Sequence, residues 1–207
     1  MGCDAFDSMN SIFCSLTVRR AVLDCAMLTI LRKGKDTARS DENRMRELFH
    51  FTNRTMSTPR PTPFGALIVS TKTGERLMRA TNAVMRDNDP SSHAELRTVR
   101  LACKKLKRTS LRGFTMYSTC EPCPMCMANA LWAGLDRVVY GATIADANRH
   151  CLQIRIPAKG MSRRSDMKCA AEGPLLRELC NSLFTHPNML RTFRTWSTRK
   201  PSAGEKR

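Results

Sequence analysis

The chain has 207 residues, of which 42% are hydrophobic, and it carries 35 Lys and Arg against 18 Asp and Glu. This composition excludes a disordered chain, and the length fits one domain of ordinary size with extensions. The formal net charge of +17 predicts a surface that attracts anions, nucleic acid included. A basic surface also keeps proteins soluble, so the charge alone does not decide the partner.

The 10 cysteines show no regular spacing of the kind that a disulfide framework has. A chain of this size without such a framework is typical of a reducing compartment, and we expect a cytoplasmic protein. Most of the cysteines are expected to be small buried hydrophobic side chains.

Residues 1–44 look unrelated to the rest of the chain and are predicted to be an N-terminal extension outside the core. The stretch Ile12–Leu31 is fairly apolar, but it is interrupted by three charged residues, Arg19, Arg20 and Asp24. These charges argue against a membrane-spanning helix, and no membrane is expected as a partner. An amphipathic helix and a start of translation at Met45 both stay open.

The core is predicted to span residues 45–186, and a basic tail over 187–207, poor in periodicity, is predicted to be partly disordered. Apolar periodicity and turn residues predict these elements in chain order: a helix over Arg44–Thr55, strands over Phe64–Ser70 and Arg76–Thr81, a helix over His93–Leu106, a strand over Phe114–Thr119, a helix over Met125–Ala133, a strand over Arg137–Ala142, a strand near Met167–Ala171 and a helix over Pro174–Phe184. This order predicts an α/β fold, with a mixed sheet of about five strands and helices on both faces.

Two cysteines stand at the start of the helix predicted over Met125–Ala133. Cys123 and Cys126 are three positions apart, so both sulfurs lie on one face, as two ligands of one metal ion must. Pro122 and Pro124 suit the first turn of such a helix, where a missing N–H costs nothing. A Cys-x-x-Cys by itself would also suit a redox pair.

A second motif upstream decides between these interpretations. His93 begins the earlier helix, and Glu95 follows two residues later. Two cysteines and one histidine supply three ligands and leave a fourth position open, as in catalytic rather than structural zinc sites. Zinc lowers the pKa of a bound water toward about 7, and Glu95 is close enough to move a proton without ligating the metal.

The sequence resembles a known enzyme family at these motifs. His93-Ala94-Glu95 followed by Pro-Cys-x-x-Cys at Pro122–Cys126 is similar to the signature of the zinc nucleobase deaminases. Pro63–Val69 and Asp89–Glu95 are similar to the branch that holds guanine deaminases, nucleoside deaminases and tRNA adenosine deaminases.

The resemblance runs from about Met45 to about Phe184, and it implies a cytidine deaminase-like fold, a three-layer helix–sheet–helix sandwich. It also implies hydrolytic deamination with a Zn²⁺ cofactor, with Glu95 as the catalytic proton shuttle, and a homodimer. The implied zinc ligands are His93, Cys123 and Cys126.

The resemblance further implies substrate contacts by Asn82, Phe64, Ala94 and Asp146. Asn82 matches an asparagine that hydrogen-bonds the base in this branch, although alone it reads as a turn residue ending a strand. Phe64 either stacks on the base or belongs to the core, and Asp146 either recognises the substrate or caps a turn. Trp132 is expected in the core rather than in the pocket.

Three segments favour a small purine-type substrate, such as guanine or a nucleoside. Cys120–Cys126 (Cys-Glu-Pro-Cys-Pro-Met-Cys) and Leu131–Ala133 are similar to guanine deaminases, and the segment Thr143–Ala147 lacks the Lys-Thr-Gly-Ala type of sequence found in the tRNA enzymes. Gln153 and Ile154, however, stand where guanine deaminases place acidic residues, so the match to guanine is incomplete.

Two alternatives to a small-molecule deaminase stay open. The first is a tRNA-specific adenosine deaminase that makes inosine, with the basic surface binding RNA. The second is an inactive deaminase-like protein that binds zinc and RNA; the presence of Glu95 argues against it.

Overall fold

The structure is a computed structural model that describes residues 40–197. The described residues from Glu42 onward belong to one compact unit, whereas Ser40 and Asp41 belong to a separate one. Most of the predicted N-terminal extension therefore lies outside the described residues. Within the described range, no helix combines the length and the apolar character that crossing a membrane requires.

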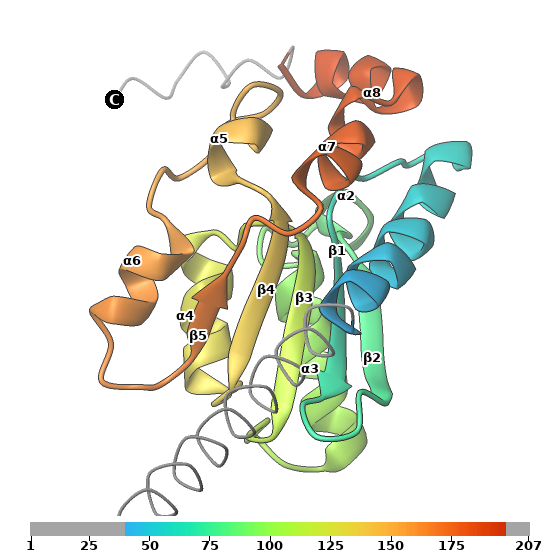
Figure 1. Ribbon diagram of the computed structural model, residues 1–207. Coiled ribbons are helices and arrows are strands. Elements are labelled where there is room, and N and C mark those ends of the chain that lie inside the picture. Colours follow the sequence, from blue (N-terminus) through green and yellow to red (C-terminus); the bar gives the residue numbers. More distant parts are fainter. Residues whose placement is uncertain (1–39, 198–207) are drawn as a thin grey trace, which may run out of the picture. The chain divides into compact units, whose positions relative to one another are not determined.

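Five strands form one mixed sheet in the order β2, β1, β3, β4, β5 (Figure 1). They are β1 (Gly65–Ser70), β2 (Arg76–Thr81), β3 (Phe114–Cys120), β4 (Arg137–Ala142) and β5 (Ala170–Glu172). β1 runs antiparallel to both β2 and β3, whereas β3, β4 and β5 run parallel to one another. The mixed five-stranded sheet predicted from the sequence is confirmed.

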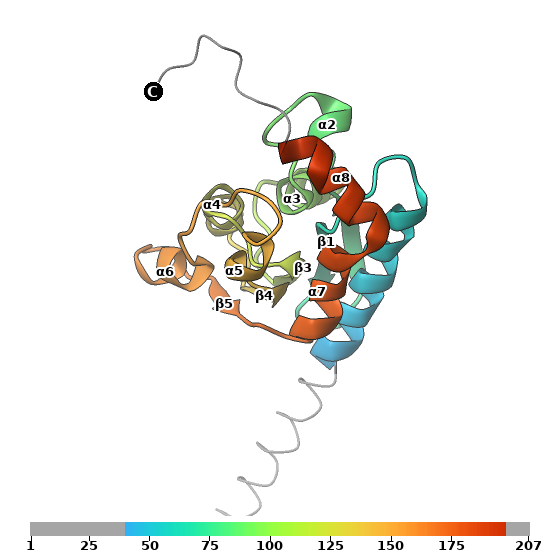
Figure 2. The ribbon, with the colours of Figure 1, turned by 90° about the horizontal axis from the view of Figure 1, so that it is seen from above.

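Helices cover both faces of this sheet, as Figure 1 and Figure 2 show from two directions. The elements are a helix over residues 40–53, η1 (Arg54–Ser57), α2 (Val84–Asp87), α3 (Ala94–Leu106), α4 (Pro124–Trp132), α5 (Ile144–Ala147), α6 (Ala158–Arg163), α7 (Arg177–Thr185) and α8 (Pro187–Ser197). α3 and α4 lie on one face, and the helix over 40–53 and α7 lie on the other. The predicted three-layer arrangement is confirmed.

The alternating side chains of β1 divide the interior into two apolar clusters. Leu67 and Val69 belong to the cluster beneath the helix over 40–53 and α7, whereas Ala66 and Ile68 belong to the cluster beneath α3 and α4. All four side chains are buried, which matches a central strand covered on both faces.

Residues 187–197 form α8, where the sequence predicted a basic tail with little periodicity. Met189 and Phe193 are buried in the cluster beneath α7, and the Asn188 side-chain amide donates to the Met56 carbonyl oxygen at 2.7 Å. The apolar face of α8 is a narrow stripe of three residues, Met189, Phe193 and Trp196. These residues stand at i, i+4 and i+7, which is the spacing of an amphipathic helix, so the sequence does contain the pattern that α8 follows.

Trp132 lies at the last position of α4 and is 78% exposed, so the expectation that it belongs to the core is wrong. α4 is apolar around most of its circumference, and its buried face consists of Cys126, Met127, Ala130 and Leu131. An almost uniformly apolar helix gives no pattern from which the buried face can be predicted.

Candidate active site

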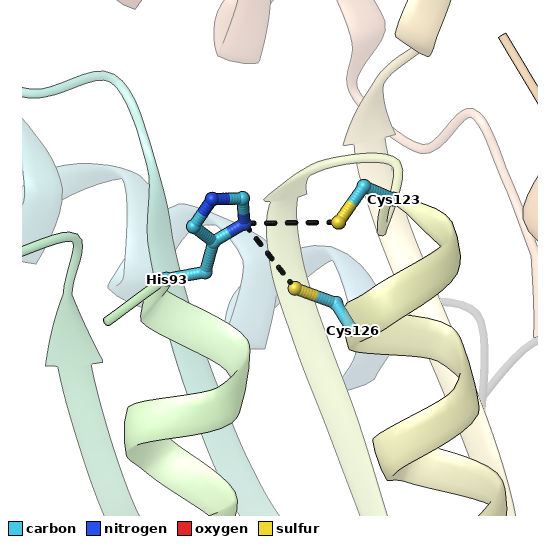
Figure 3. A group of neighbouring side chains, drawn as sticks. All are labelled: His93, Cys123 and Cys126. Atoms are coloured by element: carbon cyan, nitrogen blue, oxygen red, sulfur yellow. Dashed lines mark hydrogen bonds between the residues drawn. The ribbon is translucent and has the colours of Figure 1, made fainter. Parts of the chain in front are cut away.

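Two helices begin side by side and present their first residues to each other (Figure 3). His93 is the N-cap residue of α3, and Cys123 is the N-cap residue of α4. Both have extended backbone conformations, and neither side chain caps its own helix. Cys126 lies in the first turn of α4, on the same side as Cys123. The three side chains are therefore free to bind a ligand between the helices.

The three donor atoms lie at metal-binding separations. The His93 Nδ1 atom is 3.7 Å from the Cys123 Sγ and 3.5 Å from the Cys126 Sγ (Figure 3), and all three atoms lie within 4.8 Å of one another. Tetrahedral zinc with bonds of about 2.0–2.3 Å separates its ligand atoms by about 3.5–3.8 Å. Two thiolates and an imidazole also suit zinc chemically, so the residues present fit this metal.

The two cysteines differ in their protonation. Hydrogen bonds, first from the Cys126 thiol and then from His93, lower the pKa of Cys123 to about 4. The same hydrogen bond to Cys123, together with burial, raises the pKa of Cys126. The hydrogen bond with Cys123 raises the pKa of His93. The directions of these pKa shifts favour a thiolate at Cys123, and because zinc takes both cysteines as thiolates, binding releases the remaining thiol proton.

Glu95 lies in the first turn of α3 and is only 6% exposed. Burial raises the pKa of its carboxyl group, and the Ser118 hydroxyl donates to the Oε1 atom at 3.2 Å. A carboxyl group with a raised pKa can hold a proton closer to neutral pH than an exposed one can. Glu95 is therefore suited to accept and return a proton beside the three ligands.

A cavity of about 820 Å³ opens from His93, Glu95 and Cys123, and it is also lined by Asn82 and Phe64. The Asn82 Oδ1 atom is buried and has no hydrogen-bond partner among the described residues. A buried acceptor without a partner is costly unless a ligand supplies the donor. The sequence left open whether Phe64 contacts the base or belongs to the core. The Phe64 side chain lines the cavity and also packs edge-on against Phe184, with ring centroids 5.4 Å apart, so its position is compatible with both.

The structure does not bring Ala94 or Asp146 to this cavity. Ala94 is fully buried beneath the sheet. The Asp146 carboxylate is 0% exposed; it accepts from the Thr143 backbone N–H and hydroxyl and forms a capping box at the start of α5. Of its two interpretations, the cap is the one that the structure shows, and Asp146 is not among the residues that line the cavity.

Several residues that line the cavity were not indicated by any motif in the sequence. Glu121 is 8% exposed, and its carboxylate accepts from the backbone N–H groups of Ile144 and Ala158 at 3.1 and 3.0 Å, which ties the starts of α5 and α6 to this cavity residue. Further lining residues come from the loop after α5 and from α8: Asn148, Arg149, His150, Cys151, Leu152, Phe193 and Trp196. Gln153 and Ile154 also line the cavity.

A family model for the cytidine and deoxycytidylate deaminase zinc-binding region matches residues 38–142, just over half of the 207 residues. The chain belongs to this family. The predicted family and its Zn²⁺ cofactor are thereby confirmed, and the group formed by His93, Cys123 and Cys126 is the place in the described part of the chain that could hold the ion.

Members of the deaminase family with assigned activities are similar to part of the chain. It is 44% identical over 85 residues to guanine deaminase of Bacillus subtilis, which covers 41% of this chain and 53% of that enzyme. It is 38% identical over 80 residues to the tRNA-specific adenosine deaminase of Aquifex aeolicus, covering 39% and 52% of the two chains. The chain thus spans about half the length of the curated relatives that it matches.

A solved structure extends the similarity in fold. The guanine deaminase from Nitrosomonas europaea superimposes with a TM-score of 0.63 at 21% identity, covering 74% of this chain and 84% of that one. At this identity the likeness concerns the fold alone. It confirms the predicted helix–sheet–helix fold of the deaminase family.

Proposed function

We propose that the protein is a zinc-dependent hydrolytic deaminase, which releases ammonia from a nucleobase or nucleoside. The observation that carries the proposal is a group of three ligand atoms within 4.8 Å of one another, beside a cavity that His93, Cys123 and the buried Glu95 line. A purely structural zinc site has four protein ligands and no need of a large cavity. Here three ligands and an adjoining cavity leave room for water and substrate.

Different residues of the chain would bind the metal, transfer protons and orient the substrate. His93, Cys123 and Cys126 would hold zinc, which when bound lowers the pKa of water and makes it a nucleophile near neutral pH. Glu95 would take a proton from the attacking water and deliver protons to the ring nitrogen and to the departing amine. Ser118 holds the Glu95 carboxyl group in place through its hydroxyl. Asn82 would orient the base through the free acceptor at Oδ1.

A purine substrate is favoured by the similarity to guanine deaminase of Bacillus subtilis. The cavity wall carries Gln153 and Ile154, neither of which is acidic, so the N–H groups of guanine would find no carboxylate there. A nucleoside is accordingly as suitable a candidate as free guanine.

A tRNA-specific adenosine deaminase is the second candidate. It is supported by the similarity to the Aquifex aeolicus enzyme and by the net charge of +17, which would attract the phosphates of RNA. An intact anticodon stem-loop is therefore part of the test.

Ammonia release by the zinc-loaded protein tests the proposal. The panel contains guanine, guanosine, adenosine, cytosine, cytidine and an anticodon stem-loop that bears adenosine. Turnover of a base or nucleoside supports the first candidate, and turnover of the stem-loop alone supports the second. Zinc-loaded protein that releases ammonia from none of them contradicts the proposal.

A homodimer and a cytoplasmic location belong to the same proposal. Seven cysteines lie in the described part of the chain, and all seven are free thiols, which suits a reducing compartment. The mass in solution, measured by light scattering, tests the dimer, because a monomer at micromolar concentration would contradict it.

A further inference from the structure

We infer that the cavity contains a second subsite, beyond the base, which binds a phosphate group of the substrate through Arg149 and stacks the substrate against Trp196. The enzyme would then deaminate a base that is part of a nucleotide. This inference rests on the proposed deaminase function and concerns the outer part of the same cavity.

The cavity is larger than a free base requires. The cavity measures about 820 Å³, whereas pockets of about 300–1,000 Å³ hold ligands of drug size and a free base is much smaller. Its inner end is formed by buried groups such as Glu95 and Cys120, and its mouth by exposed ones such as Arg149 and Leu152. A base held at the zinc ligands would leave the outer part of the cavity empty.

The charged side chains that line the cavity favour an anionic ligand. Among the described residues that line the cavity, the acidic ones are Glu95 and Glu121, and both carboxylates already accept hydrogen bonds within the protein. The nearest acidic residue in sequence to Arg149 is Asp146, whose two oxygens are taken by the Arg177 guanidinium. Within the described range, the Arg149 guanidinium makes no hydrogen bond or ion pair to a side chain. An unpaired guanidinium at the mouth of a cavity suits a phosphate oxygen pair.

Aromatic side chains of α8 form one wall of the cavity. Trp196 and Phe193 reach the cavity from α8 and contact each other edge-on, with ring centroids 5.2 Å apart. Phe193 also stacks on His150, with centroids 5.6 Å apart, so the wall is fixed to the loop that carries Arg149. Aromatic side chains beside a cationic one are the usual means of holding an unpaired nucleotide.

The residues of the proposed subsite lie outside the region that the family model matches. Arg149, Phe193 and Trp196 all follow residue 142, where the match to the family model ends. The matched region contains the metal-binding group and Glu95, so the outer subsite is supplied by a part of the chain that the family model does not describe.

Tryptophan fluorescence tests the inference separately from catalysis. The chain has two tryptophans, Trp132 and Trp196, and Trp132→Phe leaves Trp196 as the single reporter. In this zinc-loaded background, binding of guanosine, adenosine and cytidine is compared with that of the corresponding 5′-monophosphates and of a short single-stranded RNA. The variants are Arg149→Ala, Arg149→Lys and, as a matched control, Arg164→Ala, which removes an exposed arginine outside the cavity.

We expect a phosphate-bearing ligand to quench Trp196 and to bind about 10- to 100-fold more tightly than its nucleoside. Arg149→Ala should abolish this preference without weakening the binding of nucleosides, Arg149→Lys should keep part of it, and Arg164→Ala should keep all of it. An effect confined to the RNA would assign the subsite to an internucleotide phosphate, and an effect with monophosphates would assign it to a 5′-phosphate.

Equal binding of nucleosides and phosphate-bearing ligands would overturn the inference, as would equal losses in Arg149→Ala and Arg164→Ala, which would indicate only the general basic surface. Suppose that ammonia release from nucleosides is unaffected by Arg149→Ala and that phosphate-bearing ligands bind no more tightly than nucleosides. The deaminase function would then be supported and the phosphate subsite contradicted. Absence of ammonia release from every substrate would contradict the function itself, and the fluorescence titration would still decide the subsite.

Discussion

The Arg177 guanidinium donates from Nε and Nη2 to the two carboxylate oxygens of Asp146, at 2.8 and 2.7 Å. Asp146 is 0% exposed and Arg177 is 44% exposed, so the pair joins a buried carboxylate of α5 to the start of α7. The loop after α5 carries Arg149 and His150 to the cavity, and α7 leads into α8. This one pair therefore fixes both segments that form the outer wall of the cavity.

Arg177→Ala should lower the free energy of unfolding. The reason is that the buried Asp146 carboxylate would lose two of its donors while keeping those from Thr143. Urea unfolding at neutral pH measures the effect. Arg164→Ala is the control, since that residue is exposed, and an equal loss in both variants would contradict a specific role for the pair.

The same pair should make stability depend on pH in acid. Arg177 first, and then the bonds from Thr143, hold the pKa of Asp146 well below its usual value. An unfolded Asp has a pKa of about 3.9, so the contribution of the pair is present above about pH 4 and is lost as the pH falls below that value. The stability difference between wild type and Arg177→Ala should be constant near neutrality and should shrink below about pH 4. A difference that grows in acid would contradict the assignment.

Glu95→Gln should keep bound zinc and lose about 10²- to 10⁴-fold in the rate of deamination, the usual contribution of a positioned proton-transfer group. Glutamine preserves the shape of the side chain but cannot accept and return a proton. Metal analysis and ammonia release on the same sample separate the two effects. Glu75→Gln, an exposed glutamate in the turn between β1 and β2, should leave both unchanged, and full activity in Glu95→Gln would rule out Glu95 as the shuttle.

Cys126→Ala should lose zinc and lower the melting temperature to that of the chelator-treated wild type. The thiolate supplies one of three ligands, and a metal that binds only the folded protein stabilises it by mass action. Metal analysis and thermal unfolding with and without chelator measure both effects. Cys103→Ala removes a cysteine outside the metal-binding group and should retain the metal. Unchanged zinc content in Cys126→Ala would refute the ligand set.

Asn82→Ala should raise KM for the substrate without destabilising the free protein. Its Oδ1 atom has no partner in the described structure, so removing it breaks no hydrogen bond and leaves only the substrate without its acceptor. The matched control is Asn129→Ala, because the Asn129 Oδ1 atom is also buried without a partner but lies outside the cavity. Equal KM values for the two variants would exclude a substrate contact by Asn82.

Gly65→Ala should destabilise the fold by about 1–3 kcal/mol, the cost of overpacking an interior. A Cβ atom at this position would lie 1.9 Å from the Thr52 Oγ1 atom, because the helix over residues 40–53 passes directly over β1. Thr52→Ala removes that oxygen, so the double variant should be more stable than the sum of the two single changes implies. Strict additivity in chemical denaturation would show that the clash is relieved in another way.

The metal site was predictable from the sequence because its geometry is local. Cys123 and Cys126 share one turn of α4, and His93 and Glu95 share the start of α3, so each pair follows from helical spacing alone. The order of the strands then brings the two helix starts together. The two-sided sheet followed from the order of helices and strands, and the continuous apolar run of β1 agrees with a strand that is buried on both faces.

The outer cavity was not predictable, because it depends on contacts between distant segments. Phe193 and Trp196 reach the cavity because α8 packs its apolar stripe on α7. The spacing of that stripe predicts a helix, but it does not say against which element the helix packs. Asp146 is a different case. Thr143 followed three residues later by an acidic side chain is a capping-box pattern, and this signal could have separated Asp146 from the substrate contacts.

The placement of His93 and Cys123 at the starts of two neighbouring helices has a mechanical consequence. These residues are 30 positions apart, and the chain between them contains α3 and β3. A cation that bridges them in the folded protein is therefore a removable cross-link between the two helix starts, and it stabilises the folded state because it binds there and not to the unfolded chain. Loss of the ion should first loosen the seam between α3 and α4, so the supply of zinc would govern how long the folded protein survives as well as whether it can react.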